Sequence, residues 1–190
     1  MNFKITLKID RKYGDLLPFN YQYEQSAVIY RILAQADTQY SSWLHENGYL
    51  LHERKRFKLF CYSPFIFEKV RPLPEAGCLK IIGERAVWYI SFIPEKSTLE
   101  FIQGIFAHQS FSIGNKKYQV AFDVVGVEAI SMPQLTEQMA FQAMSPICVK
   151  LHEDNKTQYL SPDNPMFADG ILKGLMARYE SIHGQPFDMS

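Results

Sequence analysis

Strict alternation of apolar and polar residues opens the chain and narrows the folds it can adopt. From Phe3 to Asp10 every odd position is apolar and every even position is polar or charged. Successive side chains of a strand point to opposite faces, so a period of two predicts a β-strand with one buried face and one wet, partly basic face. The chain therefore begins with a strand of a half-buried sheet.

The elements predicted after this strand repeat a simple order. They are a helix at 21–36, a short helix ending near residue 44, strands at 57–63, 79–82 and 86–93, a helix capped by Ser97, and a hairpin turned at residues 114–115. Residues 49–56 are predicted to form a loop. Strand, helix, strands, helix, strand is the βαββαβ plan of a ferredoxin-like domain, expected over residues 1–126.

A second cycle of the same kind starts after this domain. An apolar stretch from Met139 to Leu151 predicts a strand, and a turn is expected near residues 154–155. Asn164 and Pro165 then open a predicted helix that Gly184 closes. Only six residues follow Gly184, so we expect an incomplete second ferredoxin-like domain over 127–190. The predicted fold class is α+β.

Composition limits the classes of function. Twenty basic and twenty acidic residues cancel, which argues against a protein that coats nucleic acid through a global basic field but leaves room for a local basic groove. Cys61, Cys78 and Cys148 are far apart and lack metal-ligand spacing, so reduced thiols are expected and no cofactor is predicted. No apolar stretch reaches the length of a membrane helix, and the first residues do not form a signal peptide. We expect a cytoplasmic protein without a membrane partner.

Three residues between Pro18 and Ser63 could carry acid–base chemistry. His45 is the sharpest candidate, because the unperturbed pKa of histidine, about 6.5, suits proton transfer near neutrality. Each candidate also has an ordinary explanation: Tyr30 as a core tyrosine, His45 as a residue at a helix end, and Lys58 as an outward residue on a strand. Together they would suit RNA cleavage by the 2′-hydroxyl group, which needs a base, an acid and a cation but no metal.

A basic segment lies beside these candidates. Arg54, Lys55 and Arg56 are consecutive and close to Lys58. The segment is either a solvated surface loop or a clamp for RNA phosphates. In the second case the nearby aromatic residues would offer stacking faces for bases; they are Tyr49, Phe57, Phe60 and Tyr62.

Several short motifs in this order resemble one known family. They are FKITLKI, LPFNYQYEQSAVIYRIL, WLHENGY, FKLFCYSPF and, later, MSPI at residues 144–147. The chain is similar to the CRISPR-associated endoribonucleases of the repeat-associated mysterious protein superfamily, which process precursor CRISPR RNA at its repeats. MSPI resembles the strand that opens the second ferredoxin-like domain of that family.

The resemblance implies a function and a set of site residues. A tyrosine on the first helix, a leucine–histidine pair and a lysine before Leu-Phe-x-Tyr-Ser match Tyr30, His45 and Lys58. They imply a metal-independent cut that leaves a 2′,3′-cyclic phosphate and a 5′-hydroxyl, with CRISPR repeat RNA as the partner. A homodimer and the subunits of a CRISPR effector complex are the further partners considered.

One departure from the family pattern leaves alternatives open. The family carries a glycine-rich, RNA-binding loop near its C-terminus, and nothing after Gly184 matches it. We therefore expect a member that lacks its C-terminal part. The alternatives to an endoribonuclease are a non-catalytic subunit that binds repeat RNA and a scaffold for protein interactions.

Overall fold

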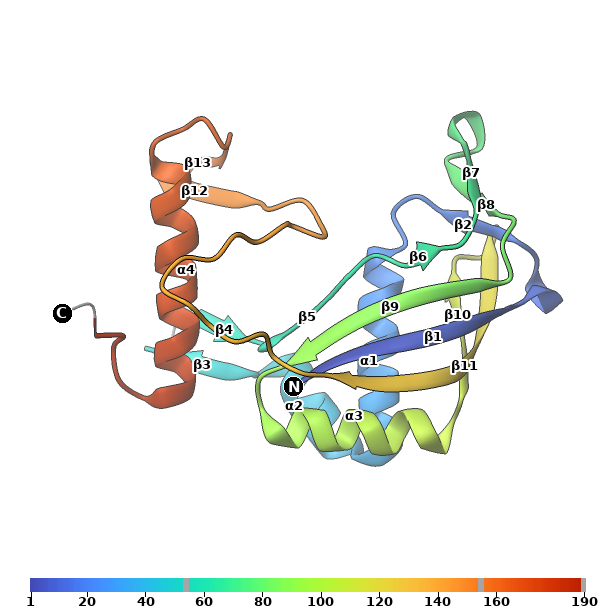
Figure 1. Cartoon of the computed structure of the whole chain (residues 1–190), viewed down its shortest axis with the longest axis horizontal. Helices are drawn as coiled ribbons and strands as arrows, with labels where there is room; N and C mark the ends of the chain where they lie inside the picture. The colour runs from blue at the N-terminus through green and yellow to red at the C-terminus, as the bar shows by residue number, and fades with distance from the viewer. Residues whose placement is uncertain (53–54, 154–155, 189–190) are drawn as a thin grey trace. The chain divides into compact units, whose positions relative to one another are not determined.

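The computed structural model describes residues 1–52, 55–153 and 156–188, which form two compact units (Figure 1). The first unit consists of Met1–His45 and Phe60–Met139, and the second of Glu46–Leu59 and Ala140–Ser190. Each unit is described by itself. Residues 46–59 belong to the second unit although they fall within the predicted first domain. The predicted boundary near residue 126 stays a prediction.

The main sheet of the first unit is antiparallel and follows the order β10-β11-β1-β9-β5, with β6 also paired to β9. Its strands are β1 (Asn2–Asp10), β5 (Phe60–Tyr62), β6 (Ile66–Phe67), β9 (Arg85–Phe92), β10 (Ser110–Gly114) and β11 (Gln119–Ile130). β1, the first strand of the βαββαβ plan, thus lies between β11, the last strand of the plan, and β9, its third strand. This is the strand order of a ferredoxin-like sheet. The α+β, ferredoxin-like prediction is confirmed.

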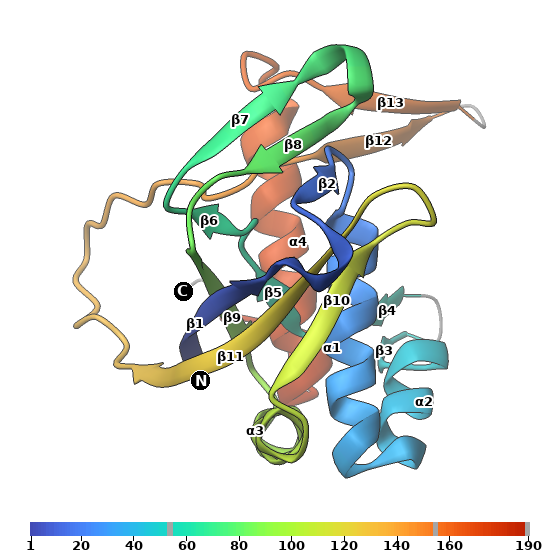
Figure 2. The same ribbon diagram turned by 90° about the vertical axis from the view of Figure 1, so that its right-hand side faces the viewer.

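Three helices complete the first unit. They are α1 (Gln22–Ala36), α2 (Thr38–Glu46) and α3 (Glu95–Ala107). Figure 2 shows α1 and α3 beside the main sheet. The prediction that Ser97 caps α3 was wrong, because the helix begins at Glu95 and Pro94 is its N-cap. Ser97 is buried inside the first helical turn instead, and its hydroxyl contacts the hydroxyl of Tyr40.

The alternation of β1 buries one face of the sheet as predicted. Its four apolar side chains are at most 4 % exposed, and Ile5 lies opposite Trp88 of β9. On the helix side, Phe101 of α3 packs against Phe3 and Phe92, with ring centroids 6.5 and 4.9 Å away. The buried side chains between the sheet and the helices form the core of the first unit, and α1 and α2 pack on this core.

A smaller sheet of order β2-β8-β7 joins the first unit. Its strands are β2 (Leu16–Pro18), β7 (Val70–Leu73) and β8 (Cys78–Ile81), with short 3₁₀ helices η1 (Arg11–Tyr13) and η2 (Pro74–Ala76) nearby. Only β8 was predicted from the sequence.

The chain between α2 and β5 differs from the prediction. The strands β3 (Tyr49–Leu51) and β4 (Lys55–Phe57) pair antiparallel to each other where a loop was expected. The single strand predicted at 57–63 is broken, because Leu59 has a φ of 56°, in the left-handed region that ends an extended run. After the break, β5 pairs with β9 of the main sheet, so that Phe60 lies opposite Phe92.

The second unit also contains a hairpin, β12 (Val149–Glu153) and β13 (Lys156–Leu160), and the helix α4 (Met166–His183). Of the strand expected from Met139 to Leu151, the end is confirmed within β12, whereas residues 139–148, MSPI included, form no strand; Pro146 there lacks the N–H group that a ladder needs. The turn predicted at 154–155 lies outside the described residues. The predicted helix is confirmed, with Asn164 Oδ1 accepting from the Met166 N–H at 2.9 Å and Gly184 closing it.

Among the described residues, every helix is too short or too polar to span a membrane.

Candidate functional site

The junction between α1 and α2 fixes the positions of Tyr30 and His45. Asp37 starts α2, because its Oδ1 atom accepts a hydrogen bond from the Tyr40 N–H at 2.8 Å. The Ser41 hydroxyl donates to the Tyr30 carbonyl at 2.8 Å and ties the two helices together. Leu44 is fully buried, so the next residue, His45, is held at the exposed side of the last turn.

The rings of Tyr30 and His45 are in direct contact. Their centroids are 5.0 Å apart and their planes meet at 84°, which is an edge-to-face arrangement. Phe60 of β5 contacts the Tyr30 ring in the same way, at 5.7 Å and 76°. Two residues that are far apart in the sequence and able to transfer protons therefore lie side by side within the first unit.

Burial changes the acidity of Tyr30. Loss of hydration raises the pKa of its phenol above the ordinary value of 10.0, and the neighbouring Tyr62 adds to the effect. The Tyr62 hydroxyl donates to the Gln22 carbonyl at 3.1 Å, which holds it beside α1. Tyr30 is therefore protonated at neutral pH, when it can donate a proton or a hydrogen bond. Sequence reasoning gave Tyr62 only a stacking role and missed its effect on Tyr30.

Lys58 belongs to the second unit, in the link between β4 and β5. Its side chain runs over Gly48, where an added Cβ atom would lie 3.4 Å from Nζ and only 2.7 Å from the Phe57 carbonyl oxygen. Only glycine fits there, since its φ is also 65°. Burial and then the charge of Arg56 lower the pKa of Lys58. Lys58 precedes Phe60, the neighbour of Tyr30, by two residues of covalent chain.

The predicted basic segment forms part of the β3–β4 hairpin. Lys55 and Arg56 are exposed on β4, and Arg56 Nη1 donates to the Glu46 carbonyl at 2.9 Å. Arg54 lies outside the described residues. A further cation that the sequence did not reveal is Arg178 of α4, which sits 5.1 Å from the centre of the Phe57 ring. No local pattern links residues so distant in the sequence.

Metal ligands do not gather in the part of the chain that the structure describes: no group of three or more His, Cys, Asp or Glu side chains is arranged to hold an ion there.

Two family models match the chain in succession. "CRISPR-associated protein Cas6, N-terminal" matches residues 16–123, and "CRISPR associated protein Cas6, C-terminal" matches residues 130–190. The first match alone covers more than half of the chain.

Individual relatives agree with these models. The CRISPR-associated endoribonuclease Cas6 1 of Methanocaldococcus jannaschii is 25% identical over all of this chain and 70% of its own length. A putative CRISPR-associated endoribonuclease-like protein Cas6nc of Pyrococcus horikoshii is 26% identical over 92% of this chain and 69% of its own length.

Solved structures give the same result. A Cas6-related protein from Pyrococcus furiosus superposes with a TM-score of 0.79 and 25% identity, over 99% of this chain and 73% of that one. A RAMP protein that binds different RNA substrates gives 0.76 and 25%, over 98% and 73%.

Proposed function

Since the chain belongs to the Cas6 family of CRISPR-associated proteins, we propose that it is an endoribonuclease that cuts precursor CRISPR RNA within its repeats. Two relatives named as CRISPR-associated endoribonucleases support the activity. The product would be guide RNA for antiviral defence, made in the cytoplasm.

The contact between Tyr30 and His45 carries this proposal. Two side chains that exchange protons lie edge to face at 5.0 Å, on a surface with His45 exposed to an incoming strand. A single cut in RNA needs one group that removes the 2′ proton and a second that protonates the leaving oxygen. DNA lacks the 2′-hydroxyl, so RNA is the substrate that such a pair can cut without an external nucleophile.

The proposed reaction is a transesterification that needs no metal. His45 takes the proton of the 2′-hydroxyl while that oxygen bonds to phosphorus. The bond from phosphorus to the 5′ oxygen breaks, and the protonated phenol of Tyr30 gives that oxygen its proton. The phenol of Tyr30 keeps its proton at neutral pH, because its pKa lies above 10.0, so it can act as the proton donor. The products are a 2′,3′-cyclic phosphate and a 5′-hydroxyl.

The cations would act on the phosphates. We assign Lys58 to the negative charge that grows on phosphorus, because it matches the lysine of the family motif and a cation is the group that this charge requires. Arg54, Lys55 and Arg56 would hold the flanking backbone of the repeat RNA.

Cleavage of labelled repeat RNA in EDTA tests the proposal. We expect one cut in the repeat, with a cyclic phosphate end, and a loss of about 10²-fold or more in rate for His45→Ala. His152→Ala is the matched control, because His152 is an exposed histidine of the second unit whose ring lies within hydrogen-bond distance of the Thr157 hydroxyl. Equal rates for the two variants, or cutting that needs added metal, would contradict the mechanism.

A second candidate is a family member that binds repeat RNA without cutting it, as a subunit of a CRISPR complex. The name of the Pyrococcus horikoshii relative, "endoribonuclease-like", favours this reading. Tight binding of repeat RNA by wild type and His45→Ala alike, with no cut by either, would establish it.

A further inference from the structure

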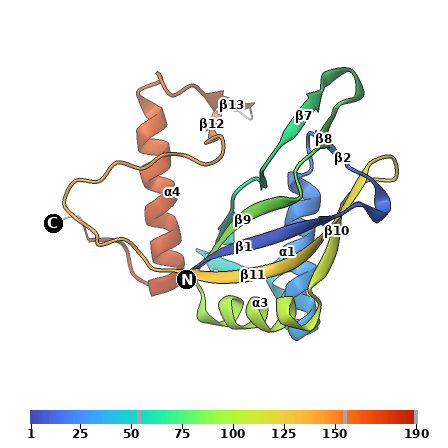
Figure 3. The ribbon, with the colours of Figure 1, turned by 45° about the vertical axis from the view of Figure 1, so that its right-hand side comes forward.

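The side of α1 that carries Tyr30 extends toward the start of the helix. A helical turn takes about 3.6 residues, so Tyr23 lies on the same side as Tyr30, about 10 Å away along the axis. Ala27 lies between them and is exposed. We call these three residues the outer stripe of α1. Figures 2 and 3 show α1 against one face of the main sheet, and none of the buried residues of the helix belongs to the outer stripe.

Tyr23 is the residue of the outer stripe that solvent reaches most. It is 82 % exposed. Among the residues that the structure describes, none forms a hydrogen bond or a ring contact with it. An exposed side chain adds little to the core, and tyrosine forms helices less readily than alanine. The stability of α1 therefore does not explain this tyrosine.

The other aromatic rings beside the outer stripe have ring neighbours. Phe60 packs on Tyr30 at 5.7 Å. Tyr62 stacks on Phe60, with ring centroids 6.3 Å apart and planes at 27°, and its hydroxyl donates to the Gln22 carbonyl in the first turn of α1. These rings form a continuous row within the first unit. Of the four aromatic residues, Tyr23 is the one whose ring is open to solvent.

We propose that Tyr23 stacks on an unpaired base of the RNA, close to the bond that is cut. The inference rests on the proposed function, because the cut is placed at Tyr30 and His45. Single-stranded RNA is recognised through bases that are splayed out and stacked on aromatic side chains. A stacked strand advances about 3.4 Å per nucleotide and a splayed strand advances further, so the 10 Å between the tyrosines places the base within roughly three nucleotides of the cut.

The surroundings of Tyr23 favour a base over a protein partner. A standard protein interface buries roughly 800 Å² on each side, whereas this surface offers one open ring flanked by the exposed polar residues Gln22, Arg31 and Gln35. The small side chain of Ala27 leaves room for a sugar and a phosphate between the two tyrosines. Every base has a π-face, so stacking does not select among bases. Tyr23 therefore requires an unpaired nucleotide near the cut but not a particular base.

Equilibrium binding of repeat RNA tests the stacking apart from cleavage. Each Tyr23 variant is combined with His45→Ala, so that the RNA stays intact. Tyr23→Ala should weaken binding about tenfold relative to His45→Ala alone, and Tyr23→Trp should keep the affinity because it keeps an aromatic face. Equal affinity with and without Tyr23→Ala would overturn the proposal and leave a protein contact as the role of this residue.

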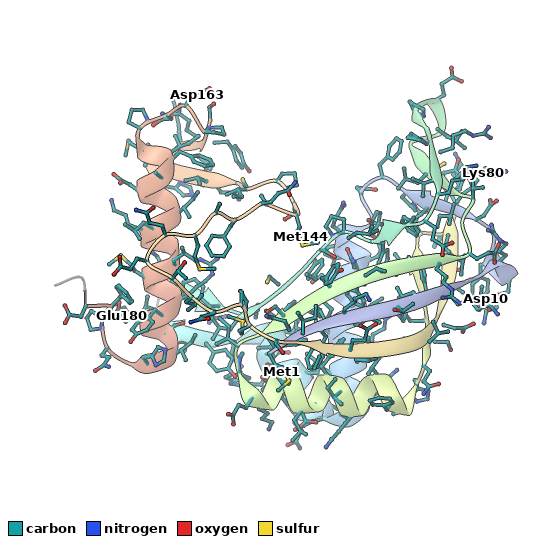
Figure 4. All side chains as sticks on the ribbon, viewed as in Figure 1. Met1, Asp10, Lys80, Met144, Asp163 and Glu180 are labelled. Atoms are coloured by element: carbon teal, nitrogen blue, oxygen red, sulfur yellow. The ribbon has the colours of Figure 1, made fainter. Side chains whose placement is uncertain are left out.

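Tyr13→Ala is the matched control, because Tyr13 is an exposed tyrosine of the same unit, at 54 %. It follows Asp10, which lies at the opposite end of β1 from Met1 (Figure 4). Tyr13 also lines a hollow of about 280 Å³ on the side of α1 that carries Val28, a buried residue outside the outer stripe. Its removal should leave the RNA affinity unchanged. Both tyrosines are exposed, so neither variant should alter the circular dichroism.

Abasic nucleotides, placed one at a time along the repeat, locate the stacked base. At one position the abasic RNA should bind about tenfold more weakly to the protein with Tyr23, and Tyr23→Ala should lose nothing further there. Losses that simply add at every position would overturn the proposal. A chain that shows this coupling but never cuts RNA would contradict the proposed cleavage and leave the stacking in place.

Discussion

Gly104→Ala should destabilise the first unit, because α1 and α3 touch at this residue. A Cβ atom added to Gly104 would lie 1.8 Å from the Ile32 carbonyl oxygen and 2.8 Å from its carbonyl carbon. Both are backbone atoms, so no rotation of a side chain can relieve the clash. The two helices would have to separate by more than about 1 Å in a core packed at crystal density.

The expected size follows from two opposing effects. Overpacking of a core typically costs about 1–3 kcal/mol, and alanine in place of glycine in a helix returns up to about 1 kcal/mol. Because the contact is with rigid backbone, the overpacking cost should lie at the upper end of its range, which leaves a net loss of about 2 kcal/mol. For a chain of this size that lowers the melting temperature by about 4–8 °C.

Thermal and urea unfolding followed by circular dichroism provide the assay, and Gly174→Ala provides the control. A Cβ atom at Gly174 of α4 meets only the end of the Arg178 side chain, at 3.2 Å. That flexible group can move, so this variant should be neutral or stabilised by up to about 1 kcal/mol. The reasoning fails if Gly104→Ala is as stable as wild type, or if both variants shift in the same direction.

Three further predictions concern the site and its surroundings. Tyr30→Phe keeps the ring that packs on His45 and Phe60 but removes the proton donor, so single-turnover cleavage should slow by about 10²-fold or more with unchanged circular dichroism. The folded pKa of Tyr30 is raised above 10.0, so the contribution of this phenol to stability is complete below pH 10 and is lost as the pH rises through the folded pKa. The unfolding free energy of wild type minus that of Tyr30→Phe should therefore be constant up to pH 10 and fall above it. Lys55→Ala should reduce the slope of log affinity against log salt for repeat RNA by about one, whereas Lys173→Ala on α4 should leave that slope unchanged, and equal effects would remove Lys55 from the proposed clamp.

Local patterns predicted the elements whose own residues decide their structure. The alternation of β1, the opening of α4 at Asn164 and Pro165 and its end at Gly184 depend on neighbours in the sequence, and all are confirmed. The strand expected at 57–63 failed because Leu59 takes a left-handed conformation that leucine rarely adopts by itself. There the tertiary pairing of β5 with β9 overrides the local preference. The strand expected at MSPI was wrong, and there Pro146 lacks the N–H group that a strand ladder needs.

The candidate site was predicted in part. Tyr30 and His45 were selected from their residue types and the family resemblance, and the structure brings their rings into contact. The catalytic roles of Tyr30, His45 and Lys58 stay a proposal. Arg178, which stacks on Phe57, and Tyr62, which raises the pKa of Tyr30, went unpredicted in those roles, because each acts on a residue far away in the sequence.

The central claim is that this chain cuts RNA through the internal 2′-hydroxyl. The most direct test compares two repeat RNAs, each incubated with wild type in EDTA. They are identical except that one carries a 2′-deoxyribose at the nucleotide preceding the cut. We expect the unmodified RNA to be cut to a 2′,3′-cyclic phosphate and the substituted RNA to remain intact while it binds with similar affinity. Cleavage of the 2′-deoxy substrate at the same bond would contradict the account.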